Sequence, residues 1–344
     1  MAERHIEILF DEPGRAYESG DAITGKVRVR VEKPTRCNGL MIFQAWYTHG
    51  KGNESEGHHD VLHLFEGDWG AGVHEYPFEF EAQPGPYTYH GRYLNLDWYL
   101  LARADVPWAF DPKDEQDFTL APPADGIDQV PMLGEVSARA AQRDLVESLA
   151  PWGKLLVALM ATLIGGAFGV YGLVAGDVGF MGFGVISGAF AVGSALVGFY
   201  GLAGRRTLGQ VEYDLPEKPC APGAMARVGV HFTPRAGGQL SSISMTLRGF
   251  ERVVSGSGTD AKTYTHDFYT QPLELSDAIT IKAGERVDLE VLVPIPEDAP
   301  SSFASADNEL GWALDLHVDI TRWPDYKETR RIVVGPAPKP GATW

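Results

Sequence analysis

The 344-residue chain is poor in cysteine and in positive charge. Cys37 and Cys220 are its two cysteines, so a disulfide framework is excluded as the main source of stability. Residues 1–150 hold 13 Lys and Arg against 26 Asp and Glu, and the remainder holds 16 against 20, which gives a net charge of −17. Nucleic-acid binding requires a basic face, so we expect no nucleic-acid partner.

The chain also lacks the sequence motifs of common enzymes. It contains no G-x-S-x-G, no H-E-x-x-H and no G-x-x-x-x-G-K-[ST], and neither cysteine lies in a reactive-cysteine signature. We therefore expect a protein that is not an enzyme and holds no cofactor. The start, MAERHIEILFDEPG, has no apolar core of about 7–15 residues after a basic segment, so we expect no secretory signal peptide.

One histidine-rich segment, EGHHDVLHLF, has to be weighed as a zinc site. It carries His58, His59 and His63, and strand alternation places His59 and His63 on one face, with His49 or His74 as further candidate ligands. A polar edge strand with solvated imidazoles explains the same residues. No second ligand pair has a recognised metal spacing, so we favour the edge strand and predict no metal.

What the chain does contain is a long central segment almost free of charge. Residues 155–176 and 178–204 carry no charged side chain, and Asp177 alone separates them. A helix of 22 residues is about 33 Å long, enough to cross a hydrocarbon core of about 30 Å. We predict a transmembrane hairpin with spans at about 155–176 and 178–204. A buried soluble hairpin is disfavoured, because no long polar surface remains to cover it.

Glycines in this segment repeat a small-x-x-x-small spacing that lets helices approach closely. They are Gly165, Gly169, Gly172, Gly176, Gly184 and Gly188. The spacing does not separate packing within one hairpin from packing between molecules. We favour packing within the hairpin and keep a homo-oligomer as the alternative.

Positive residues flank the predicted spans on one side. Lys154 precedes the first span and Arg205 and Arg206 follow the second, whereas the turn between the spans offers only Asp177. The positive-inside rule then places both flanks in the cytoplasm. We expect an integral membrane protein of a bacterial inner membrane, with both soluble halves cytoplasmic.

Both soluble halves alternate apolar and polar residues in short runs separated by turn formers, which predicts antiparallel β-sandwiches. The halves also resemble each other. Gly72 lies 26 residues before Trp98, and Gly284 lies 28 residues before Trp312. This spacing favours an internal duplication, with an N-terminal sandwich at 1–136, a linker and hairpin at 137–208, and a C-terminal sandwich at 209–344.

Several strand motifs resemble the arrestin N-terminal domain. They are Gly-Asp-x-Ile-x-Gly-x-Val at 20–27, Tyr-Pro-Phe-x-Phe at 76–80, Tyr-x-Gly-x-Tyr at 89–93 and the following LDWYLLARAD. The second half is similar to the arrestin C-terminal sandwich, and residues 137–208 fall outside the resemblance. Arrestins are soluble, and no phosphate sensor carries over to this chain residue by residue. The resemblance implies a non-enzymatic adaptor that holds membrane proteins or trafficking components.

The sequence thus predicts a mainly β, membrane-anchored adaptor or scaffold whose partners are membrane proteins or peptide segments, with the hairpin in the bilayer. Two rival hypotheses remain. In one, the glycine-rich hairpin forms an oligomeric assembly or small channel. In the other, the sandwiches lie outside the cell and act on glycans.

Overall fold

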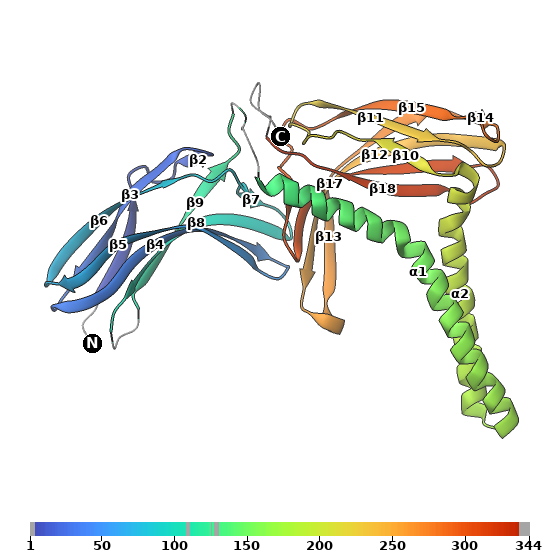
Figure 1. Ribbon diagram of the computed structural model, residues 1–344, viewed down its shortest axis with the longest axis horizontal. Coiled ribbons are helices and arrows are strands. Elements are labelled where there is room, and N and C mark those ends of the chain that lie inside the picture. Colours follow the sequence, from blue (N-terminus) through green and yellow to red (C-terminus); the bar gives the residue numbers. More distant parts are fainter. Residues whose placement is uncertain (1–3, 108–110, 125, 127–130, 337–344) are drawn as a thin grey trace.

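The computed structural model describes residues 4–107, 111–124, 126 and 131–336. The protein is mainly β, with two groups of curled sheets and two apolar helices between them in the sequence, which confirms the predicted fold class. Figure 1 shows the two groups next to each other, with the helices leaving from the C-terminal group.

The N-terminal sandwich pairs a three-stranded sheet, β1-β3-β6, with a six-stranded sheet, β2-β9-β8-β4-β5, in which β7 pairs with β8. Its strands are β1 (Arg4–Phe10), β2 (Ala16–Glu18), β3 (Ala22–Val31), β4 (Thr35–Gly50), β5 (Ser55–Trp69), β6 (Gly72–Glu81), β7 (Tyr89–His90), β8 (Leu94–Asp105) and β9 (Lys113–Ala121). Alternation along β3 buries Val27 and Val29 and leaves Arg28 on the outer face. The two sheets enclose a core that includes the fully buried Trp98.

The C-terminal sandwich pairs β10-β11-β15 with β13-β12-β17-β16, to which β14 and β18 are added. Its elements are β10 (Val211–Asp214), β11 (Met225–Phe232), β12 (Gly238–Ser255), the short 3₁₀ helix η1 (Gly258–Asp260), β13 (Lys262–Ser276), β14 (Ile279–Ile281), β15 (Val287–Pro294), β16 (Phe303–Ala304), β17 (Asn308–Ile320) and β18 (Tyr326–Ile332). Its own core is built around Trp312.

The two sandwiches share one strand plan. The order β9-β8-β4-β5 corresponds to β18-β17-β12-β13, and β1-β3-β6 corresponds to β10-β11-β15. Trp98 Nε1 donates to the carbonyl oxygen of Pro86 (2.6 Å), and Trp312 Nε1 donates to that of Pro300 (3.0 Å). Each acceptor lies twelve residues before its tryptophan. The correspondence supports the predicted duplication.

The helices are α1 (Pro131–Ala175) and α2 (Val178–Leu208). Residues 137–154, expected as a linker, belong to α1, so helix connects the sandwich region to the apolar hairpin without a break. Gly176 ends α1 with φ +68°, and the Asp177 carboxylate caps α2 by accepting from the backbone N–H of Gly179 (2.8 Å). Asp177 therefore forms the turn as well as interrupting the apolar run.

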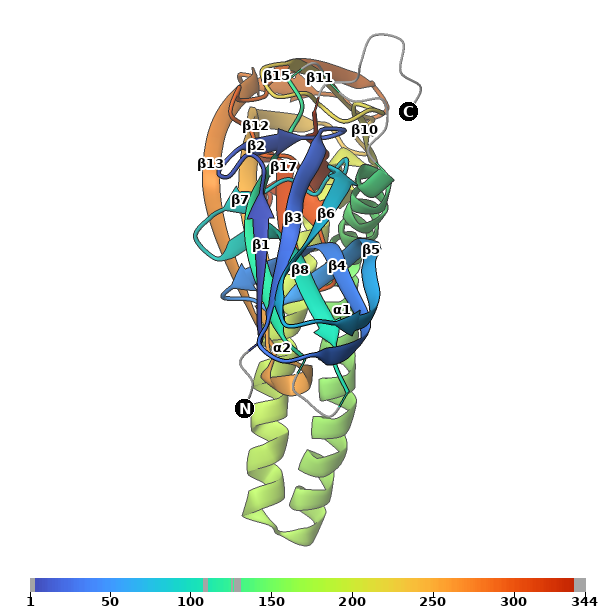
Figure 2. The ribbon, with the colours of Figure 1, turned by 90° about the vertical axis from the view of Figure 1, so that its left-hand side faces the viewer.

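The apolar parts of both helices are long enough to cross a membrane. They comprise Trp152–Ala175 and Val178–Gly198, and few of their residues are buried. Figure 2 shows the antiparallel pair projecting beyond both sandwiches. The pair therefore exposes its apolar side chains and does not form the core of either sandwich.

Candidate functional site at the junction of the helices and the sandwiches

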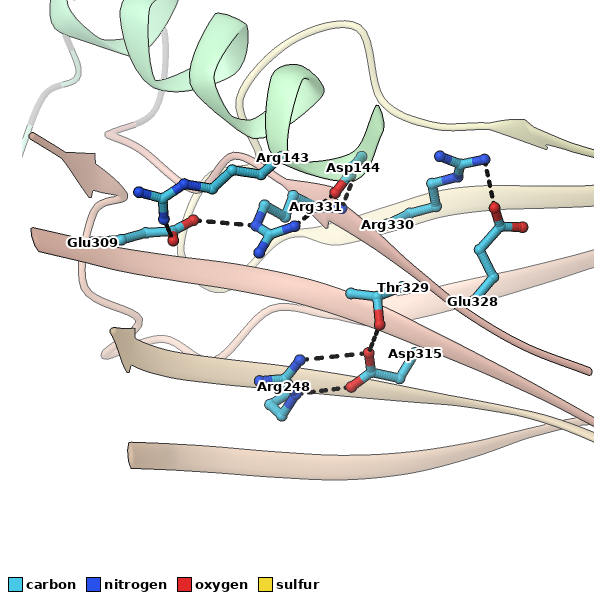
Figure 3. Close-up of polar contacts among 9 residues, drawn as sticks. All are labelled: Arg143, Asp144, Arg248, Glu309, Asp315, Glu328, Thr329, Arg330 and Arg331. Atoms are coloured by element: carbon cyan, nitrogen blue, oxygen red, sulfur yellow. Dashed lines mark hydrogen bonds and ion pairs between the residues drawn. The ribbon is translucent and has the colours of Figure 1, made fainter. Parts of the chain in front are cut away.

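The first part of α1 lies against the C-terminal sandwich before the helix continues into the hairpin (Figure 1). Asp144 on α1 accepts from Arg331 on β18 at two points, from the Nη1 atom (2.8 Å) and from the backbone N–H (3.1 Å). Arg331 Nε also lies 3.1 Å from Glu309 Oε1 on β17, and Arg143 of α1 pairs with the other oxygen of Glu309 (Figure 3). Two residues of α1 are thus tied to two neighbouring strands.

Burial makes these ion pairs structurally important. The side chains of Arg331, Asp144 and Glu309 are 8%, 12% and 7% exposed. Removing one member of a buried pair leaves an uncompensated charge and typically destabilises by about 3–5 kcal/mol. The helix that leads into the hairpin therefore cannot pivot on the sandwich without breaking these contacts.

A second polar group on the same sheet stiffens the strands that hold α1. Arg248 on β12 and Thr329 on β18 both donate to Asp315 on β17, with Nε–Oδ2 and Oγ1–Oδ1 distances of 2.8 and 2.6 Å (Figure 3). On β18, Arg330 pairs with Glu328 at 2.9 Å. The three strands are therefore joined by side chains as well as by their backbones.

The two sandwiches meet at a buried carboxylate. Glu251 on β12 is 1% exposed and accepts four hydrogen bonds from residues 89–94, the hairpin formed by the end of β7, the turn and the start of β8. Its Oε1 accepts from the Tyr89 hydroxyl (2.9 Å) and the Arg92 N–H (2.9 Å), and its Oε2 accepts from the N–H groups of Tyr93 (2.6 Å) and Leu94 (3.1 Å). Burial, together with the hydrogen bond to this carboxylate, raises the pKa of Tyr89. We call this arrangement the Glu251 clasp.

Other contacts extend the interface between the sandwiches. The amide nitrogen of Asn308, on β17, donates to Thr48 Oγ1 (2.9 Å) and to the carbonyl oxygen of Asn53 (2.7 Å). Trp46 packs edge-on against Phe303, with ring centroids 5.4 Å apart. Three residues of the C-terminal sandwich belong to the N-terminal core: Val253, Phe303 and Leu310. The sandwiches therefore form one body with a continuous apolar and polar interface.

The glycines predicted to pack the helices occupy different environments. A Cβ atom built on Gly165 would lie 2.3 Å from Ser187 Cβ, and one on Gly184 would lie 2.7 Å from Gly169 Cα. A Cβ on Gly172 would lie 2.6 Å from the backbone nitrogen of Met181. Gly165, Gly169, Gly172 and Gly184 therefore lie between α1 and α2. By contrast, Gly176 forms the turn, and no atom lies within 4 Å of a Cβ on Gly188.

The charged residues predicted to set the topology lie at the sandwich end of the hairpin. Lys154 and Arg206 are exposed there, and the side chain of Arg205 lies outside the described residues. Asp177 lies at the opposite tip, in the turn between α1 and α2.

The three histidines do not converge on a common point. His58, His59 and His63 lie exposed on β5, the edge strand of its sheet, and partial desolvation lowers the pKa of His59. His49 instead pairs with Asp97 (2.7 Å), and His74 lies in the other sheet of the sandwich, where its ring contacts the carbonyl oxygen of Gly70. Within the described part of the chain, no three His, Cys, Asp or Glu side chains are grouped to hold a metal ion.

Sequence reasoning missed the residues that organise this junction. Glu251, Asn308 and Glu309 lie on strands, where period-2 alternation marks a buried position but does not show that a polar side chain fills it. Asp144 and Arg143 resemble ordinary charges of a helix surface. The one sequence signal for these residues was the presence of two acidic residues, Glu251 and Glu309, within strands whose pattern is otherwise apolar.

Comparison with known proteins gives limited similarity. No family model matches the chain. "Arrestin domain-containing protein 17" of Caenorhabditis elegans is 26% identical over 157 residues, which cover 38% of this chain and 37% of that protein. The crystal structure of Spo0M, a sporulation control protein from Bacillus subtilis, aligns over 95% of this chain and 90% of its own, with 10% identity and a TM-score of 0.30. A TM-score this low supports no conclusion. The alignment to the worm protein agrees with the arrestin-like strand motifs over part of the chain.

Proposed function

We propose that this protein is a membrane-anchored, non-enzymatic adaptor, in which the hairpin holds an arrestin-like pair of sandwiches at a membrane surface. The observation that carries the proposal is an exposed apolar hairpin whose first helix is fixed to the C-terminal sandwich by buried ion pairs. Leu173, Val174 and Val185 are 72%, 84% and 74% exposed. Exposed apolar surface of this kind is unfavourable in water and favourable in contact with lipid. The ion pairs of Arg331 with Asp144 and Glu309 fix α1, which leads into that hairpin, to the C-terminal sandwich.

The distribution of charge supports a cytoplasmic position for the sandwiches. Exposed Lys154 and Arg206 lie where the apolar helices meet the sandwiches, and Asp177 lies at the far tip. Cytoplasmic flanks of membrane spans are enriched in Lys and Arg. Both sandwiches lie on the same side because two spans return the chain to its starting face.

Two sheet edges are suited to hold a partner segment. β6 and β15 are each the last strand of a three-stranded sheet, and each exposes an apolar side chain, Val73 (54%) on β6 and Leu292 (53%) on β15. An extended peptide can add a strand to such an edge through main-chain hydrogen bonds. Anchoring also raises the effective concentration of these edges toward other membrane proteins.

Topology mapping and site-specific crosslinking test the proposal. A reporter fused after Trp344 should give a cytoplasmic signal, and one inserted at Asp177 should give the opposite signal. A photoreactive residue at Val73 or Leu292 should capture reproducible membrane-protein partners, whereas one at the exposed Glu285, outside any strand, should not. A reporter after Trp344 on the non-cytoplasmic side, or equal capture at all three positions, contradicts the proposal.

The alternative is an oligomeric assembly or small channel built from the hairpin. Four of the six repeated glycines are occupied by contacts between α1 and α2 of the same chain, which supports the adaptor role instead. A stable oligomer in mild detergent that depends on Gly188, one of the helix glycines that face open space, would favour the assembly.

A further inference from the structure

A cavity lies between the two sandwiches, where one loop of each sandwich faces the other. Its walls include residues 84–88, between β6 and β7, and residues 297–302, between β15 and β16. The two loops correspond in the shared strand plan, because the carbonyl oxygens of Pro86 and Pro300 each accept from the buried tryptophan of the same sandwich. The cavity has a volume of about 240 Å³, smaller than the range of about 300–1,000 Å³ typical of drug-sized ligands.

The cavity is largely apolar, and its walls are held in place. Both sandwiches contribute apolar and aromatic side chains to it, namely Tyr89, Leu94, Leu96, Phe303 and Leu310. In the first loop, Thr88 Oγ1 accepts from the N–H of Leu120 (3.0 Å). In the second, Ser302 Oγ accepts from the N–H of Val334 (3.0 Å). Walls that are already fixed lose little conformational entropy when a ligand binds.

One polar group on the cavity wall is left without a partner. The hydroxyl of Tyr87 is buried, and within the described part of the chain it makes no hydrogen bond. Burial raises the pKa of Tyr87, so the hydroxyl keeps its proton. A buried hydroxyl without a partner is unfavourable, and a ligand that accepts its hydrogen bond removes that cost.

The charged groups at the cavity are acidic. Glu297 and Asp298 line it and are exposed, and among the residues that the structure describes neither has an ion pair. The described lining contains no Lys or Arg. Unpaired carboxylates beside apolar walls are complementary to a side chain with an apolar stem and a cationic head.

We propose that this cavity binds a lysine or arginine side chain of an extended partner segment. The stem of that side chain packs on the apolar walls, and its cationic head pairs with Glu297 and Asp298. A backbone carbonyl of the same segment accepts from the Tyr87 hydroxyl. The net charge of −17 also attracts basic segments.

The cytoplasmic flanks of other membrane proteins supply segments of this kind, because they are enriched in Lys and Arg. This choice of partner rests on the anchoring proposed above, whereas the selectivity of the cavity for a basic side chain does not. The described lining includes no residue of β6 or β15, so the cavity is a contact separate from the two sheet edges.

The test uses the full chain in mild detergent, at about 0.15 M salt to screen non-specific attraction. The probe is the peptide Gly-Pro-Lys-Pro-Gly with an uncharged fluorophore, because prolines keep the peptide extended. Its binding, measured by fluorescence anisotropy, is compared with that of Gly-Pro-norleucine-Pro-Gly, which keeps the apolar stem and loses the charge.

Two variants and one matched control address the groups that carry the proposal. Tyr87→Phe removes only the hydroxyl. The double variant Glu297→Gln with Asp298→Asn removes both carboxylates of the cavity. The control, Asp277→Asn with Glu285→Gln, removes two exposed carboxylates that do not line it.

We expect the wild type to bind the lysine peptide about fivefold more tightly than the norleucine peptide, because the lysine forms ion pairs at the cavity. The double variant should bind both peptides equally, and the control should behave as the wild type. Tyr87→Phe should weaken both peptides about threefold or more without lowering the midpoint of thermal unfolding, because the hydroxyl has no partner within the described chain.

The chain's own Pro-Lys-Pro sequence at 338–340 is a competing occupant, and Lys339→Gln tests it. Unchanged affinity of this variant for the lysine peptide supports a partner segment. A rise of about tenfold assigns the cavity to the chain's own segment and overturns the proposal.

The remaining outcomes separate this proposal from the anchor. Equal binding of the two peptides by the wild type overturns the basic site, as do equal losses in the double variant and the control. Absence of binding in both the wild type and Lys339→Gln also overturns it. The titration does not depend on topology, so its failure leaves the anchor intact, and a failed topology experiment leaves the cavity intact.

Discussion

At the scale of single residues, Glu251 has the most demanding environment. Its carboxylate is buried, and each of its oxygens accepts two hydrogen bonds from the β7–β8 hairpin of the other sandwich. Hydrogen bonds to an ionised acceptor are stronger than those between neutral groups. A side chain that differs by one atom can therefore lose much of this stabilisation.

Glu251→Gln should destabilise the protein by at least about 3 kcal/mol. In either orientation of the new amide, its NH₂ group would face at least one backbone N–H: that of Arg92 in place of Oε1, or those of Tyr93 and Leu94 in place of Oε2. Thermal or chemical unfolding in detergent measures the effect. Glu285→Gln, at an exposed glutamate paired with Lys282, should change stability by less than about 0.5 kcal/mol. Equal effects of the two substitutions would show that the clasp contributes little.

At the scale of elements, the hairpin depends on close approach of α1 and α2. The backbones meet at Gly169 and Gly184, where the Gly184 side has no room for a methyl group. Gly188 lies one helical turn further along α2 and has open space around its Cβ position. Two glycines one turn apart on α2 therefore differ in role: Gly184 allows the helices to approach closely, and Gly188 makes no such contact.

Gly184→Ala should destabilise the hairpin by about 1–3 kcal/mol, because the helices must separate to admit the new methyl group. Gly188→Ala should cause no loss, since alanine is the better helix former and nothing opposes its methyl group. Unfolding of both variants in a mixed-detergent titration provides the comparison. Similar losses for both would place Gly188 in a contact between molecules and favour the oligomeric alternative.

At the scale of the whole molecule, the hairpin and the sandwiches are separate in their packing. No residue between Trp152 and Gly198 belongs to either hydrophobic core. The sandwiches, by contrast, share core residues and the Glu251 clasp. Anchoring and folding of the β domains should therefore be separable.

Replacing residues 155–204 with a short flexible loop should move the protein from the membrane fraction to the soluble fraction while both sandwiches stay folded. Carbonate extraction followed by ultracentrifugation measures the location, and near-ultraviolet circular dichroism reports the packing around Trp98 and Trp312. The intact chain should resist extraction. Persistence of the shortened chain in the membrane would show that another surface provides the anchor.

Sequence alone determined the elements whose physical signal is local and periodic. Alternation along β3 marked its buried valines, and the uncharged runs around Asp177 predicted a hairpin, because solvent or lipid acts on each residue face directly. The spacing that relates Trp98 to Trp312 also predicted two like sandwiches, which the shared strand order supports. The duplication and the membrane topology remain predictions.

Tertiary structure alone decided which residues meet. Glu251 lies 157 residues from Leu94, and Arg331 lies 187 residues from Asp144, so no local pattern links the members of either pair. Strand periodicity assigns a residue to a face of the sheet but does not identify the distant residue that it contacts. That contact depends on how the fold brings distant strands together. The Glu251 clasp, the ion pairs that hold α1 and the cavity between the sandwiches all arise at that level.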